Sequence, residues 1–168
     1  MNLMTSPTWS TSTHEAGHVI AMLWFGVEFE YVTIKAKTEG LPSLGHVAIR
    51  RGWADSVAAP QVAIITAAGS VAAEKWAGSR PGRFREADDA DAAILRVRIK
   101  TDMNATCQDR FIARAVDGAL EFLEIPAIRD AAIMLAVSLE QNTTLSHANA
   151  VRIARIVPEV AWRLDAGA

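Results

Sequence analysis

The sequence has one cysteine, Cys107, among its 168 residues. A single cysteine cannot form a disulfide within the chain, which fits a reducing compartment and makes the cytoplasm the expected location. An excess of positive charge is also missing, because 17 Lys and Arg residues stand against 19 Asp and Glu residues, for a formal net charge of −2. Without a broad cationic surface to attract phosphate backbones, nucleic acid is not an expected partner.

Long apolar runs are absent as well. The two most apolar segments, 19–27 and 62–73, are well short of the roughly 20 residues that a membrane-spanning helix requires. Residues 1–13 contain no Lys or Arg, so they lack the pattern of a secretion signal, and we expect the domain to begin where the chain begins. The phosphate-binding pattern GxxxxGK[ST] does not occur. We therefore expect no membrane span and no nucleotide-driven motor in this chain.

The overall composition is typical of a globular protein. Hydrophobic residues make up 51% of the chain and charged residues 21%, which argues against a disordered or fibrous protein. A chain of this length can bury one real core but is short for two. We expect a single domain over residues 1–168.

The first half of the chain predicts two helices separated by a β-hairpin. The first helix is expected to begin among Ser10, Thr11 and Ser12, to end at Gly26, and to be buried because its second half is apolar on every side. Residues 28–37 and 46–50 alternate in part between polar and apolar, which predicts two strands. They are joined by the turn-forming segment TEGLPSLG and are expected to pair in antiparallel fashion.

The rest of the chain is expected to be helical. Pro60 and Gly78 bracket a second helix of small residues, and a group of aspartates opens a third helix, where negative charge suits the amino-terminal end. Further helical segments are predicted at 105–123, 127–140 and 147–157. The expected fold class is therefore mainly α, of the α+β type, with a small antiparallel hairpin.

One motif carries chemistry, His14-Glu15-Ala16-Gly17-His18, which has the form HExxH. On a helix, His18 lies about 40° around the axis from His14 and about 6 Å further along it, so two imidazoles can share one tetrahedral zinc ion. Glu15 lies on the same side, where it can reach a water molecule at the metal without binding the metal itself. The motif therefore predicts metal ligands at His14 and His18 and a general base at Glu15.

A catalytic zinc site usually has three protein ligands and one open position, so a third ligand is needed. Spacing alone cannot choose among the candidates, which are His46, Glu74, Asp88, Asp89, Asp91 and His147. Cys107 is expected to be a core residue rather than a nucleophile, because no base can be assigned to it. The tryptophans are also expected in the core; they are Trp9, Trp24, Trp53, Trp76 and Trp162.

Several segments resemble one family when they are taken in order. THEAGHVIAMLWFGVEFEYVTI is similar to the start of the peptidase domain of the FtsH-type ATP-dependent zinc metalloproteases. LGHV resembles that family's second strand, AAGSVAAEKWAG its GGxxAEExxxG helix, and ADDADAAILRVR the acidic start of its next helix. AVSLEQNTTLSHANAVRI is similar to the closing helices, so the resemblance covers nearly the whole chain.

The resemblance implies a zinc metalloendopeptidase acting on peptides or unfolded proteins, and it selects Asp89 as the third ligand. Asp88 and Asp91 are the alternatives if the alignment slips. The chain departs from the family in lacking its membrane segments and ATPase module, and in Ser70 and Val71, which replace a glycine and an arginine. The resemblance thus implies either a separate ATPase partner or a homo-oligomer. The alternative function is a non-catalytic adaptor or regulator that keeps the fold, with or without the metal.

Overall fold

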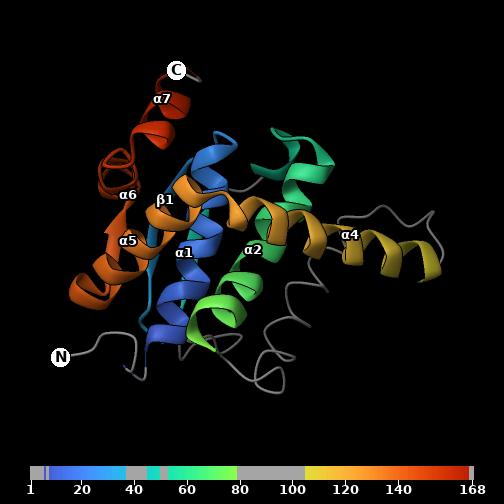
Figure 1. Cartoon of the computed structure of the whole chain (residues 1–168), viewed down its shortest axis with the longest axis horizontal. Helices are drawn as coiled ribbons and strands as arrows, with labels where there is room; N and C mark the ends of the chain where they lie inside the picture. Colours follow the sequence, from blue (N-terminus) through green and yellow to red (C-terminus); the bar gives the residue numbers. More distant parts are fainter. Residues whose placement is uncertain (1–5, 7, 37–44, 50–52, 79–104, 167–168) are drawn as a thin grey trace.

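Helix α1 (Trp9–Trp24) lies in the middle of the structure, with α2 (Ala59–Ala77) packed along it (Figure 1). This computed structural model describes residues 6, 8–36, 45–49, 53–78 and 105–166. The two helices approach closely because Gly17 has no side chain. A Cβ atom at Gly17 would overlap the carbonyl oxygen of Ala68 and would lie 2.7 Å from the Cβ atom of Ala72. The prediction of a small-residue second helix that packs closely is confirmed.

The start of α1 differs from the prediction. The helix begins at Trp9, so Ser10, Thr11 and Ser12 lie within it and do not cap it. The residue before it, Thr8, makes no side-chain cap hydrogen bond. The predicted end is close to correct, because α1 stops at Trp24 and Gly26 follows with a φ of 72°, a conformation that glycine adopts without strain.

The sheet contains the predicted hairpin and one strand more. Strands β1 (Phe29–Thr33) and β2 (His46–Ile49) pair in antiparallel fashion, with Val32 opposite Val47, and β1 is shorter than predicted. Strand β3 (Thr144–Ser146) pairs with the other edge of β1, which gives the order β2-β1-β3. The prediction missed β3 because three residues are too few to show an alternating pattern.

Helices α4 (Ala105–Glu124) and α5 (Pro126–Asn142) follow the predicted segments, and α6 (His147–Ala154) ends three residues before the predicted one. Helix α7 (Pro158–Ala166) and the short 3-10 turn η2 (Trp53–Asp55) were not among the predicted segments. Pro60 lies in the first turn of α2, and Gly78 follows it with a φ of 60°, as predicted. The predicted loop over 38–45 lies outside the described residues except for Gly45. The third predicted helix, which Asp88, Asp89 and Asp91 would open, lies outside them altogether.

The core surrounds the second half of α1, where α2, α5 and the sheet meet (Figure 1). Ile20 and Met22 are completely buried there, which confirms the prediction of a buried helix. Trp9 is also buried, but Trp162 in α7 is 72% exposed, so the prediction that every tryptophan lies in the core is wrong for Trp162. Among the described helices, none combines the length and the apolar character needed to cross a membrane.

Candidate metal centre

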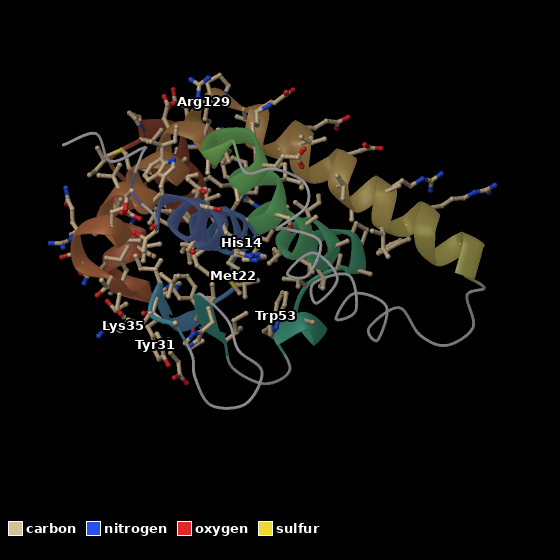
Figure 2. All side chains as sticks on the ribbon, turned by 90° about the horizontal axis from the view of Figure 1, so that it is seen from below. His14, Met22, Tyr31, Lys35, Trp53 and Arg129 are labelled. Atoms are coloured by element: carbon tan, nitrogen blue, oxygen red, sulfur yellow. The ribbon has the colours of Figure 1, made fainter. Side chains whose placement is uncertain are left out.

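The two histidines of the motif point toward a common position beside α2. The Nε2 atoms of His14 and His18 lie 3.1 Å apart, and the ring planes stand at 79° to each other with centroids 4.7 Å apart. Two imidazole nitrogens bound at about 2.0–2.1 Å to one tetrahedral zinc ion would lie about 3.3 Å apart. Figure 2 shows His14 on α1, on the side where α2 packs. The observed separation therefore fits a shared zinc ion.

The other ring nitrogen of His18 fixes its tautomer. His18 Nδ1 lies 2.8 Å from the backbone carbonyl oxygen of Ile65 in α2. A carbonyl oxygen only accepts hydrogen bonds, so Nδ1 must carry the proton and donate it. In the neutral ring the lone pair is then on Nε2, the atom that faces His14. This is the arrangement that orients histidine ligands in zinc sites.

The protonation state of His14 suits the same role. Burial, followed by the neighbouring charge of His18, lowers the pKa of His14 well below its ordinary value of 6.5. The His14 ring is therefore neutral at pH 7. A metal ligand must be in this form, because a protonated imidazole has no lone pair to offer.

Glycine makes room for the edge of the His18 ring that faces His14. A Cβ atom on Gly69 of α2 would overlap Nε2 of His18 and would lie 2.7 Å from both Cδ2 and Cε1 of the same ring. Any side chain at position 69 would therefore displace the imidazole edge that faces His14. The sequence shows a glycine here but gives no sign that it lies against the motif.

The carboxylate of Glu15 lies between α1 and the start of β2. Only 4% of the Glu15 surface is exposed. A Cβ atom on Gly45, the residue before β2, would lie 2.7 Å from Glu15 Oε1 and 2.9 Å from the carbonyl oxygen of Thr33. Gly45 thus allows the chain to pass close to the carboxylate. It is a second residue that sequence reasoning did not connect to the site.

Three of the candidate third ligands are described, and none joins the histidine pair. Glu74 is exposed on α2. His46 lies in β2, with its Nε2 atom 3.4 Å from the hydroxyl of Tyr31. His147 packs edge-on against Phe29, with ring centroids 4.7 Å apart, and is half-buried.

Within the described part of the chain, no group of three or more His, Cys, Asp or Glu residues is placed to hold a metal ion. Asp88, Asp89 and Asp91 lie outside the described residues. The structure therefore shows the histidine pair and Glu15, and Asp89 stays a prediction. Cys107 is half-buried in α4.

A comparison with protein-family models and with curated proteins finds no match to this sequence. The fold and the site define a mainly helical α+β protein whose central helix carries an HExxH motif. What distinguishes this site is the combination of two converging imidazole nitrogens with a buried carboxylate, all within residues 14–18 of α1.

Proposed function

We propose that the protein is a zinc-dependent metalloendopeptidase that hydrolyses peptide bonds in peptides or unfolded proteins. The observation that supports this most strongly is the 3.1 Å approach of His14 Nε2 to His18 Nε2, with His18 Nδ1 bound to the Ile65 carbonyl. A zinc ion at this position would bind the two imidazole nitrogens, and Glu15 follows His14 directly on the same helix, where its carboxylate can reach a water molecule at the metal.

In this proposal His14 and His18 hold the metal through their Nε2 atoms. When bound, zinc supplies a Lewis acid that polarises the peptide carbonyl and lowers the pKa of water to about 7. Glu15 accepts a proton from the attacking water as the carbon–oxygen bond forms. It then donates that proton to the amide nitrogen as the carbon–nitrogen bond breaks. Substrates would arrive already unfolded, or a separate ATPase would unfold them.

The role of Glu15 is tested by Glu15→Gln, which keeps the shape of the side chain but removes the base. We expect zinc content to stay at the wild-type level and the peptide cleavage rate to fall about 10²- to 10⁴-fold. Glu121→Gln makes the same chemical change on an exposed face of α4 and should leave the rate unchanged. If the zinc-loaded wild-type protein cleaves no peptide, the adaptor function is supported. If Glu15→Gln cleaves peptides at the wild-type rate, Glu15 is excluded as the base.

The third ligand is tested by three single substitutions of neighbouring aspartates. Asp89→Ala should lose most of the bound zinc, because a site with two protein ligands holds the metal weakly. Asp88→Ala and Asp91→Ala should keep it and serve as controls of equal charge change. Zinc content is measured by atomic absorption after dialysis. If Asp88→Ala or Asp91→Ala loses the bound zinc instead, the third ligand is the aspartate at that position.

A further inference from the structure

A pocket of about 400 Å³ lies at the carboxyl end of α1. It is lined by the last residues of α1, by the turn into β1, and by α6 and α7. His14 lies ten residues before Trp24 on the same helix, about 15 Å away along the axis, so the pocket is separate from the candidate metal centre. The volume lies in the range of small-molecule sites.

The walls of the pocket are mainly apolar. Leu23 and Val27 are buried at 4% and 3% exposure, and Val151 and Leu164 are half-buried residues from α6 and α7. Small-molecule sites typically combine such walls with a few charged or polar groups that fix the orientation of the ligand. The charged groups of this pocket therefore decide which ligand fits.

Arg163 supplies the positive charge. Its guanidinium carbon lies 5.8 Å from the ring centroid of Trp24, a cation–π arrangement that holds the group at the pocket. No carboxylate pairs with Arg163 among the residues that the structure describes. Arg155, which also lines the pocket, is already engaged, because its Nη2 atom lies 2.7 Å from Oδ1 of Asp165. One guanidinium is thus open to an anionic group.

Glu28 supplies a negative charge on the same lining. It is exposed and makes no salt bridge with a described lysine or arginine. Its charge acts on His147, another lining residue, where it opposes the effect of burial on the pKa of that imidazole. The pocket is therefore lined by one positive group, Arg163, and one negative group, Glu28, and neither forms a salt bridge with another described residue.

We propose that this pocket binds a small zwitterion with an apolar side chain, of the chemical class of the apolar α-amino acids. The ligand carboxylate pairs with Arg163, its ammonium group with Glu28, and its side chain contacts Leu23, Val27 and the other apolar walls. A ligand without the ammonium group would leave Glu28 facing a second negative charge. A ligand without the carboxylate would leave Arg163 unmatched. The proposal is independent of the metal centre.

The pairing is tested by titration calorimetry of the full chain with three ligands of the same shape. L-Leucine carries both charges, 4-methylpentanoate lacks the ammonium group, and L-leucinamide lacks the carboxylate. We expect leucine to bind and each analogue to bind at least about tenfold more weakly, because each loses one charge-assisted contact. The proposal is overturned if leucine gives no binding at millimolar concentration, or if either analogue binds as tightly as leucine.

Two substitutions locate the binding in this pocket. Arg163→Gln and Glu28→Gln should each weaken leucine binding about tenfold. Arg152→Gln is the matched control, because Arg152 lies on α6, contacts Asn149 and does not line the pocket. An equal loss in Arg152→Gln would show a general charge effect and contradict the proposal. If a pocket variant does not fold, as judged by circular dichroism, the comparison of the three ligands decides the question.

Discussion

At the scale of single residues, two glycines on neighbouring helices have different effects although both lie at the α1–α2 contact. A side chain on Gly17 would meet the backbone of Ala68, which cannot move without moving α2. A side chain on Gly69 would instead meet the imidazole of His18, which can rotate away. The first glycine therefore serves the packing of the two helices, and the second leaves room for the ring of His18, the proposed metal ligand.

This difference predicts opposite outcomes for the same substitution. Gly69→Ala should lower zinc affinity about 10- to 100-fold by displacing His18 from the Ile65 carbonyl. The stability of its metal-free form should change by less than about 1 kcal/mol, because alanine favours a helix interior. Gly17→Ala should destabilise the protein by about 1–3 kcal/mol through overpacking.

Competition with a chromophoric chelator measures the zinc affinity of both glycine variants, and urea denaturation measures their stability. The role of Gly69 as a positioning residue is wrong if Gly69→Ala binds zinc as tightly as the wild type does. It is also wrong if its affinity falls only in proportion to a loss of stability.

The sequence could predict the histidine pair and Glu15 because HExxH links side-chain type to a fixed angle on a helix. It could not predict the contributions of Gly69 and Gly45, which come from α2 and from the start of β2. Each glycine matters because its missing side chain leaves space for a residue that is distant in sequence, His18 for Gly69 and Glu15 for Gly45. The sequence alone does not show which residue lies next to a glycine in the fold. The same reason kept spacing from choosing among the candidate third ligands.

At the scale of elements, a carboxylate on α5 joins that helix to the start of α1. Glu140 accepts a hydrogen bond from the Ser12 hydroxyl at one carboxylate oxygen and from the Thr8 hydroxyl, at 2.9 Å, at the other. Its negative charge lies near the amino-terminal end of α1, where a helix dipole favours an anion. Glu140 thus joins α5 to the first turn of α1 through side-chain hydroxyls, which is a different contact from the predicted cap on backbone amides.

We predict that Glu140→Ala lowers the free energy of unfolding by about 1–3 kcal/mol, since two hydrogen bonds to a charged group are lost. Glu121→Ala on the exposed face of α4 should change it by less than about 0.5 kcal/mol. Ser12→Ala combined with Glu140→Ala should cost less than the sum of the two single changes, because they share one contact. Strict additivity in urea denaturation would argue against this link.

The elements themselves were largely predictable, because helix periodicity and the placement of Pro60 and Gly78 are local signals. Strand β3 was not, since Thr144–Ser146 is extended only because it pairs with β1. The same strand places Thr143 so that its carbonyl oxygen accepts hydrogen bonds from the Ile34 amide and the Thr33 hydroxyl. A contact between residues about 110 positions apart leaves no pattern within either segment.

At the scale of the whole molecule, the carboxyl-terminal helices pack against the end of α1 and the start of β1, where His147 is partly buried. Burial lowers the pKa of His147 below 6.5, and Glu28 opposes this effect. The unfolded chain therefore binds more protons at His147 than the folded protein does as the pH falls below 6.5. Because the unfolded state binds these protons more readily, the free energy of unfolding falls as the pH falls, and His147 contributes to this loss of stability in acid.

We predict that His147→Gln reduces the loss of stability between pH 7 and pH 5, and that Glu28→Gln increases it. The first change removes the titrating group, and the second removes the charge that favours its protonated form. Arg155 and Arg163 line the same pocket and are unchanged in both variants. Urea denaturation at the two pH values measures the effect, and an identical pH dependence in all three proteins would refute the assignment.

The central claim is that His14 and His18 hold one zinc ion, and X-ray absorption at the zinc edge tests it most directly. For the purified, zinc-loaded protein we predict one zinc per chain, with two imidazole nitrogens at about 2.0–2.1 Å and a carboxylate oxygen among the remaining ligands. His14→Ala and His18→Ala should each abolish this spectrum. A protein that binds no zinc, or a spectrum that persists when either histidine is removed, would contradict the claim.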